Sequence, residues 1–216
     1  MVDDEVVLLL HGLWMNHLAM WPLAHALEGE GFATLSPNYR SMLGTPQENL
    51  DRVAALVTSL QARRIYLVGH SLGGLLALAL LQRQSQEERA GTRRRLGRAV
   101  LLGAPVAGCE AGRAMSGHAF GRWLLGETMP LWNAAPVPAV PVGCEVGVIA
   151  GTRRVGLGGM AVHLEGANDG VVQVEETRIP GLADHRVLPV SHSGMLLSRE
   201  VARQCAAFLR QGKFAS

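Results

Sequence analysis

The chain has 216 residues, of which 48% are hydrophobic and 18% charged, and its formal net charge is +2. A chain of this length and composition can bury a sizeable core, so we interpret residues 1–216 as a single globular domain. The small net charge gives no electrostatic reason to expect a nucleic acid or a membrane surface as a partner. A local cluster of arginines is expected to be a solvated surface patch, and it comprises Arg93, Arg94, Arg95 and Arg98.

The cysteines and the first residues bear on the cellular compartment. Cys109, Cys144 and Cys205 lie far apart and form no CxxC motif, so reduced thiols are expected rather than a disulfide framework. The acidic residues 3–5 precede the first apolar run, where a signal peptide would carry basic ones. No apolar stretch is long enough to span a bilayer. These features predict a cytoplasmic protein without an integral membrane segment.

Short apolar runs without polar alternation recur along the chain, as a parallel sheet covered by helices on both faces requires. The runs are Val6–Leu10, Phe32–Leu35, Ile65–Val68, Ala99–Leu102, Val146–Ala150 and Val187–Val190. Because helical patterns separate them, we predict an α/β doubly wound fold with a mainly parallel sheet of about six strands. Pro189 is compatible with the last strand only if that strand lies at an edge of the sheet.

Three helices have clear sequence signals. Residues 45–48 form a capping box with proline at the first helical position, and an apolar stripe follows, which predicts an amphipathic surface helix. From Leu72 to Leu81 the chain is apolar nearly all round and then becomes polar, so this helix is expected to start buried and emerge towards solvent. A further helix is predicted over residues 193–209.

Residues 106–145 break this rhythm with four prolines and several aromatic residues, and they are interpreted as an insertion between two strands. Its aromatic residues, together with those that follow the first strand, have two interpretations of similar weight. They could line an acyl pocket or cap it as a lid, or they could belong to the ordinary core. The candidate substrate-binding residues are Trp14, Trp123 and Trp132.

The motif that carries chemistry is Gly69-His70-Ser71-Leu72-Gly73. G-x-S-x-G by itself is weak evidence, but here it follows a buried strand and opens a buried helix, which is the setting of a nucleophile elbow. Small residues on both sides of Ser71 leave room for neighbouring backbone. A serine hydroxyl is a poor nucleophile at neutral pH, so it needs a base and an acid that orients the base.

On this motif and its setting, the chain resembles the α/β-hydrolase family over nearly its whole length, and within it most closely the compact bacterial lipases and esterases. The resemblance implies a triad in the order Ser, Asp or Glu, His. His192 lies between the last predicted strand and the last predicted helix, as the family's catalytic histidine does. Asp169, followed by Gly170, matches the position of the acid.

Several residues compete for these roles. Glu165 is a weaker candidate for the acid, and a turn function is the alternative for Asp169. Asp184 and His185 fit poorly because they precede the last strand, roughly 16 Å from the catalytic edge. The remaining histidines are expected to be structural or solvated, and they are His11, His17, His25, His70, His118 and His163.

An attacked carbonyl becomes an oxyanion, which two backbone N–H groups usually stabilise. Leu72, directly after the nucleophile, supplies one amide. The sequence His11-Gly12-Leu13-Trp14 resembles the His-Gly oxyanion loop of lipases, so the resemblance assigns the second amide to Leu13. A tight turn at Gly12 is the alternative.

Together these residues predict a serine hydrolase, an esterase or lipase, that cleaves carboxylic esters through an acyl-enzyme on Ser71, with a small-molecule ester or acyl substrate and no metal or organic cofactor. An acyl thioesterase or an acyltransferase with the same triad is the nearest alternative, because the motifs fix the acyl-enzyme and not the leaving group. A non-catalytic scaffold that binds a ligand or partner is less favoured, since no triad member is missing.

Overall fold

The computed structural model describes residues 4–90, 95–108, 139–155, 164 and 166–216. Its centre is a six-stranded sheet in which every neighbouring pair is parallel, with the order β2-β1-β3-β4-β5-β6. The strands are β1 (Glu5–Leu10), β2 (Ala33–Leu35), β3 (Arg64–His70), β4 (Leu96–Leu102), β5 (Val146–Gly151) and β6 (Asp184–Leu188). The predicted strand count and parallel arrangement are therefore confirmed.

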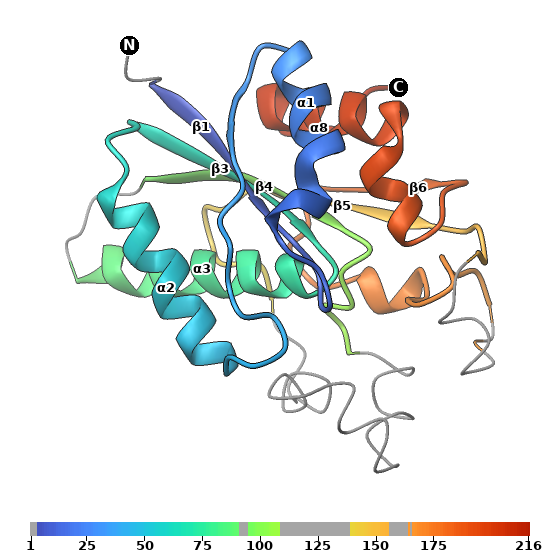
Figure 1. The fold of residues 1–216 in the computed structure, drawn as a ribbon, viewed down its shortest axis with the longest axis horizontal. Coiled ribbons are helices and arrows are strands. Elements are labelled where there is room, and N and C mark those ends of the chain that lie inside the picture. Colours follow the sequence, from blue (N-terminus) through green and yellow to red (C-terminus); the bar gives the residue numbers. More distant parts are fainter. Residues whose placement is uncertain (1–3, 91–94, 109–138, 156–163, 165) are drawn as a thin grey trace.

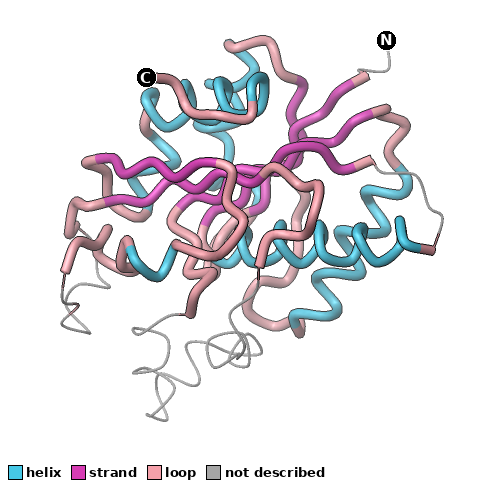
Figure 2. Tube along the Cα trace, turned by 180° about the vertical axis from the view of Figure 1, so that it is seen from behind, coloured by secondary structure: helices cyan, strands magenta, loops and turns pink. Residues whose placement is uncertain are grey.

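Helices cover both faces of the sheet, which gives three layers (Figures 1 and 2). Helices α1 (Trp21–Gly29) and α8 (Arg199–Gln211) pack on one face, and α2 (Pro46–Ser59) and α3 (Leu72–Arg89) pack on the other. Each face has its own apolar core, because side chains of a strand alternate between the two faces. Among the described helices, none combines the length and the apolar character needed to cross a membrane.

The predicted helix signals are largely confirmed. Thr45 caps α2 by accepting from the Glu48 amide, and the Glu48 side chain accepts from the Thr45 amide in return. Helix α3 begins at Leu72 among buried residues and ends among polar ones. Helix α1 was not predicted, since its nine residues carry no strong start or stop signal beyond Pro22.

Two predicted boundaries near the end of the chain are wrong. The helix predicted over residues 193–209 is divided into a 3₁₀ turn, Ser193–Leu197, and α8. Ser198 separates them because its backbone is extended and its hydroxyl accepts from the Val201 amide, which starts a new helix. The last strand ends at Leu188, before Pro189, and it is an edge strand as proline requires.

The predicted solvated arginine patch is also wrong for two of its members. The Arg95 guanidinium donates to the carbonyls of residues 57, 58, 60 and 62 at the end of α2. Arg98 donates to the carbonyls of Leu209 and Arg210 at the end of α8 and pairs with Glu145 at 2.8 Å. These half-buried cations are thus engaged by carbonyls at and just beyond helix carboxyl ends, and are not simply solvated. Arg93 and Arg94 lie outside the described residues.

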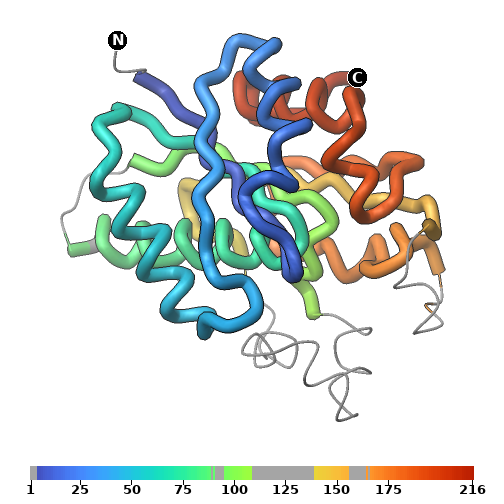
Figure 3. The backbone as a smooth tube through the Cα atoms, in the orientation of Figure 1, coloured from blue at the N-terminus to red at the C-terminus, as the bar shows by residue number. Residues whose placement is uncertain are grey.

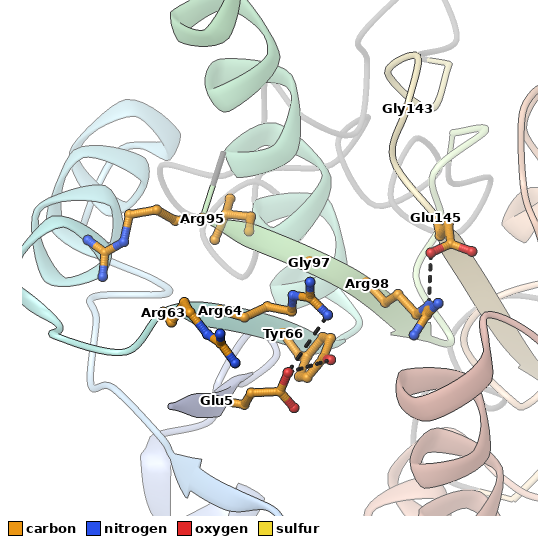
Figure 4. A pocket seen from close by; sticks show the side chains of 10 residues that line it. Glu5, Arg63, Arg64, Tyr66, Arg95, Gly97, Arg98, Gly143 and Glu145 are labelled. Carbon is orange, nitrogen blue, oxygen red and sulfur yellow. Dashed lines mark hydrogen bonds and ion pairs between the residues drawn. The ribbon is translucent and has the colours of Figure 1, made fainter. Parts of the chain in front are cut away.

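The same arginines border a cavity of about 580 Å³ at the amino ends of the strands (Figure 4). Arg64, the first residue of β3, pairs there with Glu5 at 3.7 Å, and Figure 4 shows the Arg95 side chain directed away from them towards α2. This cavity therefore lies at the opposite end of the strands from the G-x-S-x-G turn, and the arginines that line it already have hydrogen-bond or ion-pair partners.

Helix α3 and strands β1 and β3 approach so closely that no side chain fits between them. A Cβ placed on Gly73 would lie 2.1 Å from the Leu10 carbonyl oxygen, and one on Gly69 would lie 2.3 Å from the Gly73 carbonyl oxygen. Both contacts are with backbone, which cannot rotate away. The two glycines of the motif thus permit the turn that carries Ser71 to pack against β1.

We predict that Gly73→Ala destabilises the protein although alanine favours helix, lowering the free energy of unfolding by at least about 2 kcal/mol. The cause is the clash of the new methyl group with the Leu10 carbonyl. Urea unfolding measures the effect. Gly29→Ala is the matched control, because a Cβ there meets nothing within 4 Å. Equal stability of the two variants would contradict the packing described above.

Candidate active site

Ser71 lies on a strained turn between β3 and α3. Its backbone has φ 54° and ψ −120°, and it is one of two described non-glycine residues with positive φ. The Ser71 amide donates to the Leu102 carbonyl at the end of β4, with N and O 2.9 Å apart, which holds the turn in place. The residue is only 8% exposed. Such strain persists where the surroundings enforce it, as the predicted nucleophile elbow requires.

Asp169 and His192 meet in a buried pair. Asp169 lies in the connection from β5 to β6, and His192 follows β6. The His192 Nδ1 and Asp169 Oδ2 atoms are 2.7 Å apart, and the His192 amide donates to the Asp169 carbonyl with N and O 3.0 Å apart. The structure therefore brings together the two residues that the sequence assigns as acid and base.

The other carboxylate oxygen of Asp169 is fixed by the backbone. The amides of Val171 and Val172 donate to Oδ1 over distances of 2.9 and 2.8 Å. A carboxylate only accepts hydrogen bonds, so the proton between the two side chains belongs to Nδ1 of His192. This leaves Nε2 as the ring nitrogen that can take a proton from a serine hydroxyl.

Gly103 was not predicted as a site residue, yet it gives the acid–base pair its space. It follows β4 with φ +53°, and a Cβ on it would lie 2.9 Å from Asp169 Oδ2 and 3.1 Å from His192 Nδ1. The available signal was a glycine placed directly after a buried strand. Because the preceding residue, Leu102, accepts from the Ser71 amide, this corner of β4 connects the pair with the nucleophile turn.

The loop after β1 packs directly against Ser71. A Cβ on Gly12 would lie 3.0 Å from His70 Nδ1 and 3.2 Å from the Ser71 Cβ, so a larger residue would fit only if these side chains shifted. Leu13 follows, and no acceptor for its amide is found among the described residues. The Leu72 amide is the first of α3, where a helix offers no acceptor of its own. Neither amide is therefore used in a hydrogen bond among the described residues.

The predicted substrate-binding tryptophans can be placed only in part. Trp14 lies at φ 64°, next to Leu13, and is 48% exposed. Trp123 and Trp132 lie outside the described residues, as does most of the insertion predicted over residues 106–145.

His11 and Tyr39 support the loop after β1 from behind. Their rings stack with centroids 4.0 Å apart and an interplanar angle of 7°. The Tyr39 hydroxyl donates to the His11 carbonyl, and His11 Nδ1 lies 3.0 Å from the Gly12 carbonyl oxygen. Burial lowers the pKa of His11 and raises that of Tyr39. His11 is thus structural, as expected, whereas no sequence signal pointed to Tyr39.

His70 ties the nucleophile turn to the base. Its Nε2 lies 2.9 Å from the His192 carbonyl oxygen, and the two imidazole centroids are 4.7 Å apart. A carbonyl accepts, so Nε2 carries the proton. Burial first, and then the neighbouring His192 imidazole, lower the pKa of His70 to about 3. The side chain is therefore neutral at ordinary pH. Its structural role, as expected from the sequence, is to hold the backbone of His192 through this hydrogen bond.

The rival acid and base at the start of β6 have other partners. Asp184 accepts from the amides of His185 and Phe214, each with N and O 2.8 Å apart, and His185 Nε2 lies 2.8 Å from the Thr177 hydroxyl. Both are the first residues of β6 and do not precede the strand as predicted, but they do lie at its amino end, away from His192. His17 and His25 are exposed, whereas Glu165, His118 and His163 lie outside the described residues.

A fold of this topology with such a site defines a class of protein. The sequence matches the alpha/beta hydrolase family over residues 7–204, and the chain belongs to that family. The general activity that this membership supports is that of a hydrolase. A search of curated proteins found no match.

Among solved structures, the chain resembles the mature form of the Bacillus licheniformis lipase BlEst2, with 17% identity and a TM-score of 0.73 over 96% of this chain and 91% of that one. The propeptide form gives 17% identity and a TM-score of 0.75 over 97% of this chain, which spans 50% of that longer chain. The RedJ thioesterase from the prodiginine biosynthetic pathway of Streptomyces coelicolor gives 16% identity and a TM-score of 0.62, covering 97% and 86%. At these identities the likeness establishes the fold.

The depressed pKa of His70 predicts a loss of stability in acid. The unfolded chain binds a proton at this histidine near pH 6.5 and the folded chain only near pH 3, so stability is full above pH 6.5 and falls as the pH drops. His70 alone contributes a loss of about 1 kcal/mol between pH 6.5 and 5.5. Urea unfolding at both pH values measures it.

His70→Gln, which keeps a donor but cannot titrate, should lose less stability over this interval than the wild type. His25→Gln, at an exposed site on α1, serves as the control and should follow the wild type. The same pH dependence in all three proteins would show that His70 is not held neutral by the fold.

Proposed function

We propose that this protein is a serine hydrolase that cleaves carboxylic esters, with Ser71 as nucleophile, His192 as base and Asp169 as the acid that orients it. The observation that carries the proposal is the 2.7 Å contact between His192 Nδ1 and Asp169 Oδ2, at the sheet edge where Ser71 stands on a strained turn. The strand register supports this common edge, because Gly69 pairs with Leu101 and Gly151 with Leu188 near the strands' carboxyl ends.

The proposed reaction has two halves. The Ser71 hydroxyl oxygen bonds to the ester carbonyl carbon while its proton moves to His192 Nε2, and the carbonyl oxygen becomes an oxyanion. The amides of Leu13 and Leu72 donate to that oxyanion. The bond to the alcohol then breaks, the alcohol oxygen takes the proton from His192, and an acyl-enzyme remains. Water repeats the sequence, releasing the carboxylic acid and restoring Ser71.

A thioester would pass through the same acyl-enzyme, and the similarity to a solved thioesterase keeps this second candidate. Comparing release of p-nitrophenol from esters with release of thiol from acyl-CoA separates the two. A non-catalytic scaffold is disfavoured because neither the acid–base pair nor the nucleophile turn is disrupted among the described residues.

We predict that a fluorophosphonate probe labels the wild-type protein at Ser71 and does not label Ser71→Ala. His192→Ala and Asp169→Asn should each lower kcat/KM for p-nitrophenyl butyrate by about a thousandfold or more, because each removes a member of one proton-transfer unit. Circular dichroism of each variant checks that the fold is intact.

The chain offers matched controls for both substitutions. His185→Ala and Asp184→Asn change the same residue types at the amino end of β6, so they should leave kcat/KM within a few-fold of the wild type. If the control variants lost activity and His192→Ala or Asp169→Asn kept it, the assignment of base and acid would be wrong. Labelling of Ser71→Ala at the wild-type rate would show that Ser71 is not the nucleophile.

A further inference from the structure

A second cavity, of about 230 Å³, lies between α2 and α3. Its lining is predominantly apolar, and no charged residue of the described ranges contributes to it. The apolar and aromatic residues that line it are Tyr39, Pro46, Leu50, Leu72, Leu75, Leu76 and Ala79, and Gln47 and Asn49 complete the lining. The segment from β2 to α2 crosses α3 in the view of Figure 3, and Tyr39 of this segment lines the cavity.

The α3 wall starts at the nucleophile. Leu72, Leu75, Leu76 and Ala79 are spaced i, i+3, i+4 and i+7, so they form one face of the helix. Leu72 directly follows Ser71, and seven residues further on the wall has advanced about 10 Å along the axis. The cavity wall therefore follows α3 from Leu72, the residue that directly follows the predicted nucleophile in sequence, to Ala79.

The Tyr39 wall joins the cavity to the predicted oxyanion loop. The Tyr39 hydroxyl donates to the His11 carbonyl, and the Tyr39 ring stacks on the His11 imidazole. Tyr39 therefore offers a ligand the carbon atoms of its ring and not a free polar group. The side-chain amide of Asn49, a buried residue of the lining, is likewise engaged, because it donates to the carbonyls of Arg40 and Gly44. Gln47, the other polar residue of the lining, donates its side-chain amide to Asp51. A ligand in this cavity therefore gains mainly from apolar contact.

We propose that the cavity binds the acyl chain of the substrate, up to about eight carbons long, and so makes medium-chain esters the preferred class. The proposal rests on the proposed function, because it places the ester carbonyl at Ser71. The length follows from volume: an apolar cavity of about 150 Å³ accommodates benzene, with six carbons, so one half as large again accommodates about eight or nine. A chain that leaves the carbonyl beside Leu72 and follows α3 ends near Ala79.

The expected signature is a rise of kcat/KM with acyl length that stops when the cavity is full. Each methylene moved from water into apolar surroundings can raise kcat/KM by about fourfold. In a series of p-nitrophenyl esters from acetate to palmitate, the rise should therefore continue to about the octanoate and then end.

Two variants locate the chain in this cavity. Ala79→Met fills the far end, so the ratio of kcat/KM for octanoate to that for acetate should fall by about tenfold or more, and the optimum should move to shorter chains. Leu75→Ala enlarges the cavity, so the acyl length with the highest kcat/KM should move to longer chains. Ala55→Met adds the same side chain at an exposed position of α2 that does not line the cavity, and it should keep the wild-type ratio.

The outcomes separate this inference from the proposed function. Hydrolysis of acetate with an octanoate ratio that neither Ala79→Met nor Leu75→Ala changes would overturn the acyl-pocket assignment and leave the serine mechanism standing. A response confined to a series of alcohol chain lengths would assign the cavity to the leaving group and also overturn it. Absence of any Ser71-dependent hydrolysis would overturn the proposed function itself. Thermal unfolding of each variant confirms that the folded protein is being measured.

Discussion

The site depends on a close approach of backbone that three glycines make possible. Gly73 lets α3 touch the end of β1, Gly69 lets the turn close on itself, and Gly12 lets the loop after β1 reach the Ser71 side chain. A methyl group at any of these positions would meet a non-neighbouring atom at 3.2 Å or less, and at Gly69 and Gly73 that atom is backbone. The positive φ of Ser71 is the geometric consequence, because the chain must reverse within a few residues.

From that constraint the remaining geometry follows by topology. Parallel strands present their carboxyl ends at one edge, so the connections after β1, β3, β4, β5 and β6 converge although they are distant in sequence. Two contacts then set the base in place, with the Asp169 carboxylate and with the His70 Nε2–H, and the absence of a side chain at Gly103 leaves room for both the His192 ring and the carboxylate. The amides of Val171 and Val172 fix the carboxylate in turn, which leaves the imidazole little rotational freedom.

Much of this could be predicted because strand ends are visible in the sequence. Buried apolar runs place Ser71, Asp169 and His192 after the third, fifth and sixth strands, and parallel pairing brings them to one edge. Tyr39 and Gly103 were missed because their roles exist only in tertiary contacts with distant segments. Arg95 and Arg98 were misinterpreted for the same reason, since nothing in the neighbouring sequence indicates that their guanidinium groups reach the ends of helices distant in the chain. The cytoplasmic location stays a prediction.

Direct trapping of the acyl-enzyme tests the central claim most directly. p-Nitrophenyl trimethylacetate carries a hindered acyl group, so attack by water is slowed and the intermediate should accumulate. After an acid quench, the mass of the intact protein should increase by one trimethylacetyl group, and fragmentation should place that group on the peptide containing Ser71. Turnover with no such adduct, or with the adduct on another residue, would contradict the account.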